Sequence, residues 1–282
     1  FAGLWVIIMG NSTVAMTITN MVNFGGDNHR ALIALCAALF AIVAWAVLAW
    51  YFGIPTSQSH SLIAGLTGAA IALQGSFDAI NGAEWIKVVY GILLSTLLGF
   101  FLGWLNSKAL GRVCRNMDRK KTSRFFRWAQ VASGAGVAFM HGAQDGQKFM
   151  SIFVLAITLA TGVGQADQMI LPIWLMFFCA LNMGLGTAVG GERIIKSVGL
   201  DMVKLEPFQG FAASVATFFC LMLSTFAGLP VSTTHTNTTD IMGVGAAKRT
   251  SAVKWGIAID LVKTRVLTFP GCGLHGLAFA PM

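Results

Sequence analysis

Charged side chains are scarce in this sequence. Asp, Glu, Lys and Arg together make up 11% of the 282 residues, whereas soluble domains usually carry about a quarter. Hydrophobic residues make up 56% of the chain and its mean hydropathy is +0.72, so there are too few polar side chains to cover a surface in water. The composition excludes a soluble globular protein and predicts an integral protein of a lipid bilayer.

The sequence also lacks the alternating pattern, repeated over about ten residues, that marks the strands of a membrane β-barrel. Its apolar runs are continuous and near twenty residues long, which favours helices because a helix satisfies all of its own backbone groups in lipid. We therefore predict an all-α polytopic membrane protein. The expected membrane segments are about 1–19, 31–52, 59–74, 86–107, 128–140, 149–163, 170–190, 208–229, 235–247 and one after 253.

Four of these segments are shorter than the ~20 residues that a straight spanning helix needs. Each of the four borders Gly, Pro or a polar cluster. We predict that they are half-helices or re-entrant segments. They are 59–74, 128–140, 149–163 and 235–247.

The cysteines show neither the spacing of a metal site nor a disulfide framework. Four of the five lie inside apolar runs, so we interpret them as small hydrophobic residues. We expect no structural metal and no cofactor. The five are Cys36, Cys114, Cys179, Cys220 and Cys272.

Much of the positive charge lies in one segment, 108–127, which contains a single acidic residue, Asp118. The positive-inside rule predicts that this segment is a cytoplasmic loop of a plasma-membrane protein. A nucleic-acid patch is the competing interpretation, but the run is short and directly joins two membrane segments, so no nucleic-acid partner is expected. The basic residues are Lys108, Arg112, Arg115, Arg119, Lys120, Lys121, Arg124 and Arg127.

One polar motif occurs twice. "GIPTSQSH" at 53–60 and "GLPVSTTH" at 228–235 share Gly, Pro, Ser and His at a constant offset of 175 residues, and each closes a long apolar run. Such a match indicates a duplicated unit. We predict a first repeat at 1–107, the basic loop at 108–127 and a second repeat at 128–282. In transporters, matching Gly/Pro-interrupted helices surround a binding site near the bilayer midplane.

The hydroxyl groups of these motifs suit a tetrahedral oxyanion such as phosphate or sulfate. A broken helix exposes backbone N–H groups and the positive end of its dipole, and Ser and Thr add neutral donors. The alternative is that the hydroxyls cap helices or bond to their own backbone. The candidate ligands are Ser57, Ser59, Ser232, Thr233 and Thr234, with His60 and His235 as further candidates.

A second polar island, "MHGAQDGQK" at 140–148, lies between two apolar segments. A carboxylate deep in a bilayer costs roughly 2.5–3.5 kcal/mol, so Asp145 should face a cavity and meet a cation, a proton or Lys148. An ordinary loop at the membrane surface is the alternative. Besides Asp145 and Lys148, the candidates here are His141, Gln144 and Gln147.

"FMHGAQDGQK", "GIPTSQSH", "GLPVSTTHT" and "IMGVGAAKR" together resemble the inorganic phosphate transporter (PiT) family of cation-coupled phosphate permeases. The resemblance implies two inverted-topology repeats and phosphate uptake coupled to Na⁺ or H⁺ by alternating access. It implies that Gln144 and the Ser/Thr clusters bind phosphate, and that Asp145 with Gln147 couples the cation. The resemblance leaves the choice of ion, free or metal-bound phosphate, and a homodimer open.

The sequence departs from the family pattern at several places. Gln144 stands before Asp145 where the family usually has Asn, and Asp240 lies where a small or apolar residue is expected. Asp260, Lys263 and Arg265 interrupt the expected last span. At the 175-residue offset, the counterpart of Asp145 would fall at position −30, so we expect the first signature helix to be missing from this chain.

Three other functions remain as alternatives. A permease for sulfate or another tetrahedral oxyanion would use the same hydroxyl groups, and a passive anion channel would use the same path. His141 and Asp145, together with His60, His235 and Ser232, could also form an intramembrane hydrolase or acyltransferase site. An enzyme needs one nucleophile with one dedicated base, however, and this chain has two copies of the same hydroxyl–His element.

The orientation of the basic segment can be tested by cysteine labelling. In a background without the native cysteines, Ser123→Cys should not react with an impermeant thiol reagent added outside intact cells, because the positive-inside rule places 108–127 in the cytoplasm. Reaction after permeabilisation is the control. Ready labelling in intact cells would invert the predicted topology.

Overall fold

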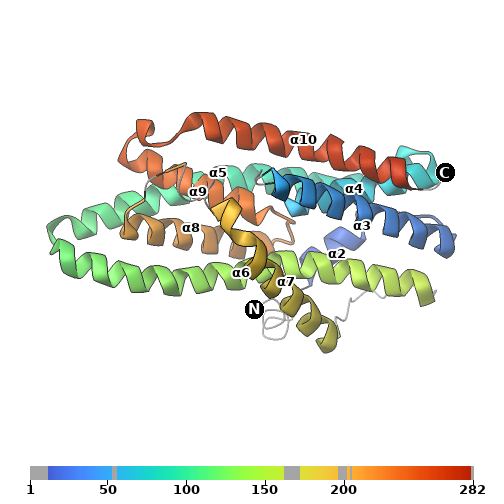
Figure 1. Ribbon diagram of the computed structural model, residues 1–282, viewed down its shortest axis with the longest axis horizontal. Coiled ribbons are helices and arrows are strands. Elements are labelled where there is room, and N and C mark those ends of the chain that lie inside the picture. The colour runs from blue at the N-terminus through green and yellow to red at the C-terminus, as the bar shows by residue number, and fades with distance from the viewer. Residues whose placement is uncertain (1–11, 53–55, 162–171, 196–201, 204, 281–282) are drawn as a thin grey trace.

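The protein is an assembly of helices (Figure 1), seen in a computed structural model that describes residues 12–52, 56–161, 172–195, 202–203 and 205–280. No named β-strand occurs in these ranges, and the predicted all-α polytopic fold is confirmed. The helices are α2 (Thr13–Thr19), α3 (Asn28–Tyr51), α4 (Gln58–Gln74), α5 (Gly82–Val113), α6 (Arg119–Thr161), α7 (Ile173–Ile195), α8 (Pro207–Phe226), α9 (Thr233–Lys248) and α10 (Trp255–Phe279). Residues 1–11, which belong to the predicted membrane segment 1–19, and residues 53–55, which begin the motif at 53–60, lie outside the described ranges.

The outer faces of several helices are apolar. Among the described helices, α3, α8, and α5 with its following turn are long and apolar enough to cross a membrane. Large hydrophobic side chains on α3, α5 and α7 point outward, where hydrocarbon rather than water would solvate them. They include Phe40, Val43, Val47, Leu93, Leu97, Phe101, Phe177, Leu181 and Leu185.

Helix α6 corrects one prediction. The segments 128–140 and 149–163 were expected to be separate half-helices, but α6 is continuous for 43 residues and includes the polar island 140–148. The alternative of a surface loop at this island is therefore also wrong. The helix needs no break because its buried polar side chains find partners on other helices, as Asp145 and Lys148 do.

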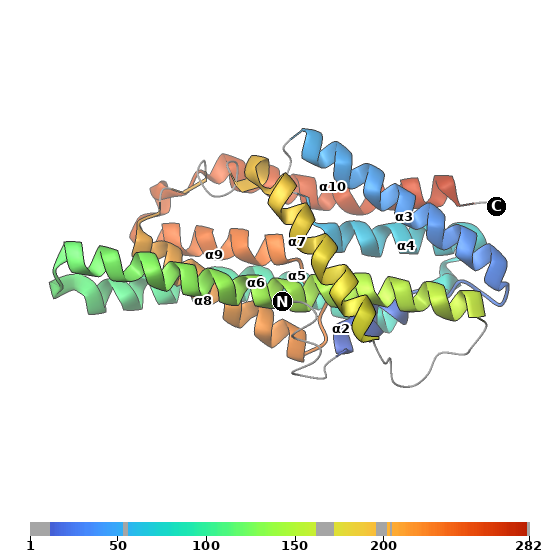
Figure 2. The same ribbon diagram turned by 60° about the horizontal axis from the view of Figure 1, so that its bottom comes forward.

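The basic segment 108–127 is also not a loop. Helix α5 extends to Val113 and α6 begins at Arg119, so most of the positive side chains lie on two helix ends joined by a short turn. Asp118 accepts a hydrogen bond from the backbone N–H of Lys120 at 2.8 Å, at the start of α6. Figures 1 and 2 show this α5–α6 hairpin projecting at one end of the molecule.

The half-helices predicted at 59–74 and 235–247 are confirmed as α4 and α9. With 17 and 16 residues, both are shorter than the ~20 residues needed to span a bilayer. Each packs along a long helix from the other half of the sequence, α4 along α10 and α9 along α5. Because α5 follows α4 and α10 follows α9, this exchange is reciprocal. It favours two repeats, whose boundaries and inverted relation stay predictions.

Glycines allow these pairs to approach closely. A Cβ at Gly68 of α4 would overlap the backbone carbonyl of Gly273 on α10. A Cβ at Gly243 of α9 would overlap that of Phe100 on α5. Gly68 and Gly243 are separated by 175 residues, the offset of the duplicated motif. The α4–α10 and α9–α5 pairs therefore use a glycine at the same place in the half-helix for their close contact.

Substitution of the α5 glycines should test this packing. A Cβ at Gly103 would overlap the carbonyl oxygen of Asp240 on α9, whereas nothing lies within 4 Å of a Cβ at Gly111 on the same helix. Gly103→Ala should lower stability by about 1–3 kcal/mol through overpacking, seen as a lower Tm in detergent. Gly111→Ala is the control and should be neutral or stabilising, because Ala loses less backbone entropy. Equal Tm values for the two variants would contradict close packing at Gly103.

Candidate functional site

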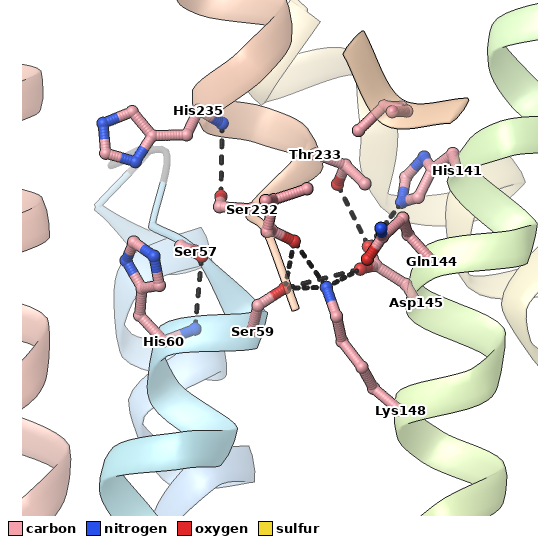
Figure 3. A network of polar contacts seen from close by, with 12 residues as sticks. Ser57, Ser59, His60, His141, Gln144, Asp145, Lys148, Ser232, Thr233 and His235 are labelled. Atoms are coloured by element: carbon pink, nitrogen blue, oxygen red, sulfur yellow. Dashed lines mark hydrogen bonds and ion pairs between the residues drawn. The ribbon is translucent and has the colours of Figure 1, made fainter. Parts of the chain in front are cut away.

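The N-terminal ends of α4 and α9 meet inside the molecule (Figure 3). Each helix begins at a serine N-cap with nearly the same backbone angles, φ −94° and ψ 112° at Ser57 and φ −84° and ψ 115° at Ser232. Ser57 Oγ accepts from the backbone N–H of His60, and Ser232 Oγ accepts from that of His235, both at 3.2 Å. The duplicated sequence motif thus folds into a duplicated cap.

Ser57 and Ser232 therefore cap their helices, which was the alternative to ligand binding in the sequence analysis. Because a serine hydroxyl that accepts a hydrogen bond keeps its own hydrogen, each can still donate to an anion. The two histidines that follow the caps lie together: the rings of His60 and His235 are 5.6 Å apart in an edge arrangement, and His60 stacks on Phe269 of α10 at 4.8 Å. Both imidazoles are buried between the half-helices.

Helix α6 brings Asp145 to this junction. One carboxylate oxygen, Oδ2, accepts from Thr233 Oγ1 at 3.0 Å and lies 2.8 Å from His141 Nε2. The other, Oδ1, contacts Ser59 Oγ at 3.4 Å and the ammonium of Lys148 at 2.9 Å. Asp145 therefore connects α6 with the first turns of both half-helices.

The ammonium of Lys148 is surrounded by oxygen atoms. Its Nζ donates to Ser59 Oγ at 2.7 Å, to the carbonyl of Val231 at 2.5 Å and to Asp145. The residue is only 1% exposed. A hydroxyl, a carbonyl and a carboxylate are also ligands that a small hard cation takes, so this ammonium stands where a cation site could form.

The linker between α8 and α9 presents the Val231 carbonyl to Lys148. Gly228 has φ +66°, the left-handed region that favours glycine, and its carbonyl accepts from Thr17 Oγ1 at 3.0 Å. Thr13 Oγ1 donates to the carbonyl of Thr225 at 3.2 Å. Short helix α2 therefore fixes this turn from the other side.

His141 lies between Asp145 and the exterior. Its side chain is 43% exposed, whereas that of Asp145 is 11% exposed. Since His exchanges protons near neutral pH, the imidazole is a candidate to pass a proton to the buried carboxylate. Asp145 thus has one partly exposed partner, while Ser59, Lys148 and Thr233 are buried.

Two of the glutamines of α6, Gln144 and Gln147, are fully buried and lack some or all of their hydrogen bonds. Gln144 Nε2 donates to Thr225 Oγ1 at 2.9 Å and to the Leu229 carbonyl at 3.3 Å. Among the described residues, Gln144 Oε1 and both amide atoms of Gln147 have no hydrogen-bond partner. Because unpaired buried polar atoms are costly, these amides are candidates to contact a bound ion, substrate or water.

Not every predicted residue joins this junction. Ser59, Thr233, His141, Asp145 and Lys148 form one network, and Gln144 reaches it through the α8–α9 linker. Thr234 is only partly buried, and Asp240 lies two turns further along α9, against α8. The described residues contain no group of three His, Cys, Asp or Glu side chains that could hold a metal ion.

Sequence reasoning missed three threonines that position the site. Thr225, Thr13 and Thr17 act through Gln144 and the α8–α9 linker. Their neighbours in sequence are apolar or small, so no local pattern separates them from threonines that bond to their own helix. The contacts that reveal them join residues more than 80 positions apart.

Comparison with known proteins gives concordant matches. A sequence model described as the phosphate transporter family matches residues 1–276. A probable low-affinity inorganic phosphate transporter of Bacillus subtilis is 37% identical over 91% of this chain and 76% of its own length. A protein of the same description from Rhizobium meliloti is 37% identical over 84% of this chain and 70% of its own length.

A solved structure titled "The sodium-dependent phosphate transporter" shares the fold, with a TM-score of 0.84 and 18% identity over 99% of this chain and 88% of that one. These relatives are transporters, so the interpretation as an intramembrane hydrolase or acyltransferase is wrong. With its apolar helices, the protein is an integral protein of the plasma membrane. The chain belongs to the phosphate transporter family.

Proposed function

We propose that this protein imports inorganic phosphate together with a cation, Na⁺ or H⁺, by alternating access around the junction of α4, α6 and α9. Membership of the phosphate transporter family supports a phosphate permease. The observation that carries the site is the meeting of two capped helix N-termini with one buried Asp–Lys pair, seen in Figure 3.

Phosphate would be bound by groups that already converge at this junction. Two helix N-termini direct positive dipole ends and backbone N–H groups at it, and Ser59 and Thr233 add hydroxyl donors. The ammonium of Lys148, which is surrounded by oxygen atoms at the centre of the network, supplies a full positive charge. A phosphate oxygen would replace Asp145 or Ser59 as its partner.

The negative charge of Asp145 repels phosphate until the carboxylate is neutralised. Two unit charges of the same sign 4 Å apart repel by about 4 kcal/mol at an effective dielectric constant of 20. A cation must therefore bind at the carboxylate when phosphate replaces Asp145 as the partner of Lys148. A proton could arrive through His141, and Na⁺ could use Asp145 with the unpartnered amide oxygens of Gln144 and Gln147.

The same contacts support alternating access. In this structure the network closes the junction, because Asp145 and Lys148 join α6 to Ser59 on α4, Thr233 on α9 and Val231 of the linker. Binding of phosphate and cation would exchange these contacts for contacts to the ligands. One bundle can then move against the other around the site.

Uptake of labelled phosphate into proteoliposomes tests the function and the coupling ion together. Imposed Na⁺ and proton gradients are applied separately, and unlabelled phosphate and sulfate are added as competitors. We expect accumulation against a phosphate gradient with one of the two ions and competition by phosphate. Preferential competition by sulfate would assign another oxyanion, and uptake that only equilibrates phosphate would indicate a channel.

Asp145→Asn should abolish cation-driven accumulation in this assay. The substitution removes the charge and keeps the shape, so phosphate would no longer need a cation in order to enter, and weak binding can persist. Asp118→Asn, at the exposed turn before α6, is the control and should behave as wild type. If Asp145→Asn concentrates phosphate with unchanged dependence on the driving ion, Asp145 is structural.

The hydroxyl groups should contribute to phosphate affinity. The double variant Ser59→Ala, Thr233→Ala removes two donors, each worth ~0.5–3 kcal/mol, so the KM for phosphate should rise from several-fold to more than a hundredfold. Thr67→Ala is the matched control, because Thr67 Oγ1 bonds to the carbonyl of Ile63 within α4. An unchanged KM in a correctly inserted double variant would remove these hydroxyls from the site.

A further inference from the structure

Asp240 is a second carboxylate buried in the helical region, and its surroundings differ from those of Asp145. The residue is 0% exposed. Its Oδ2 lies 2.5 Å from Thr217 Oγ1 on α8, and its Oδ1 has no hydrogen-bond partner among the described residues. No described Lys, Arg or His forms an ion pair with it, whereas Asp145 has an ammonium, an imidazole and two hydroxyls.

Helix α5 meets Asp240 with two glycines, Gly99 and Gly103. A Cβ at Gly99 would lie 2.7 Å from both Asp240 Oδ1 and Thr239 Oγ1, and a Cβ at Gly103 would overlap the Asp240 carbonyl. The glycines therefore create the space into which the carboxyl fits. They supply no charge to it.

None of the other described titratable groups near Asp240 is placed as a cationic partner for its carboxyl. On α8, Cys220 faces the Ser95 carbonyl of α5 at 3.9 Å. On α10, the exposed Lys263 lines a groove of about 660 Å³ together with His235 and Thr239 of α9. From α6, Asp145 meets α9 at its first turn, and Lys148 meets the linker that precedes α9.

The hydrogen-bond count at Thr217 indicates where a proton belongs. Its hydroxyl has one hydrogen, yet two acceptors lie within reach, Asp240 Oδ2 and Asn237 Oδ1 at 3.3 Å. If Asp240 Oδ2 carries a proton, it donates to Thr217, and Thr217 donates to Asn237. An ionised carboxylate in this position would have a single hydroxyl donor for its whole charge, in a region where unpaired charge is expensive.

We propose that the carboxyl of Asp240 is a proton-binding site of its own, distinct from the Asp145 junction, at the contact of α5, α8 and α9. Proton uptake converts the carboxylate to a neutral acid that fits between Gly99 and Thr217. Proton loss leaves a charge with no cationic partner among the side chains that the structure describes, and favours separation of α9 from α5.

The position of Asp240 on α9 connects this site with transport, a step that rests on the proposed function. Thr233 and Asp240 are seven residues apart and so lie on one stripe of the helix, about 10 Å apart along its axis. A movement of α9 that breaks the bond of Thr233 to Asp145 also moves Asp240 against Gly99 and Thr217. Proton binding at Asp240 would therefore favour the closed position of α9 seen here.

Infrared spectroscopy of the purified protein tests the proton directly and needs no transport. A protonated carboxyl has a carbonyl stretch separate from those of amides and carboxylates, and the band shifts in D₂O. We expect this band at neutral pH in the wild type, its loss in Asp240→Asn and its retention in Asp145→Asn. Absence from the wild type, or persistence in Asp240→Asn, would overturn the proposal.

Three further measurements keep the test decisive. If Asp240→Asn does not fold, Thr217→Val serves instead: the band should remain and move to higher frequency, because the acid loses its acceptor, and an unshifted band would contradict the geometry. A band that is lost on addition of Na⁺ at constant pH would assign the site to sodium and overturn a proton site.

In proteoliposomes, Asp240→Asn should lose one step of the pH dependence of uptake, and an unchanged profile would remove Asp240 from coupling. If no variant or wild type transports phosphate, the proposed function fails while the infrared result stands.

Discussion

The buried ammonium of Lys148 is the constraint on which the rest of the structure depends. A charge that is 1% exposed inside a membrane protein must keep its oxygen partners, since removing one partner of a buried pair typically costs about 3–5 kcal/mol. Its partners come from α4, from the α8–α9 linker and from α6 itself. Lys148 and its partner Asp145 therefore hold the two half-helices against α6, and any opening of the junction needs a replacement ligand for the ammonium.

The half-helices impose a second requirement. A helix of 16 or 17 residues that begins inside the protein leaves unpaired N–H groups at its first turn, and in lipid these groups must be satisfied by the protein. Ser57 and Ser232 meet part of this need by capping, and a bound anion can meet more. The long helices α5 and α10 cover the half-helices, and glycines such as Gly68 and Gly243 let the backbones come together.

Helix α9 connects two different carboxylate environments. At its start, Thr233 reaches a carboxylate that has an ammonium and an imidazole as partners, and two turns later Asp240 has one threonine hydroxyl. The first environment suits exchange between phosphate and a cation, and the second suits a neutral acid. A rigid helix that carries both transmits a change at one to the other, because side chains seven residues apart move together.

The sequence by itself determined the membrane class, the helical fold, the two short helices and the duplicated motif. It also singled out Asp145, Lys148, Ser59 and Thr233 as candidates, because polar residues in so apolar a chain are few and their motifs stand out. Only the tertiary structure decided that α6 is continuous through its polar island, that Ser57 and Ser232 are caps, and that Thr217 and Thr225 support Asp240 and Gln144. The reason is physical: whether a buried polar group breaks a helix or stays within it depends on partners from distant segments, such as Thr233, 88 residues from Asp145. Local periodicity and motif spacing do not predict those contacts.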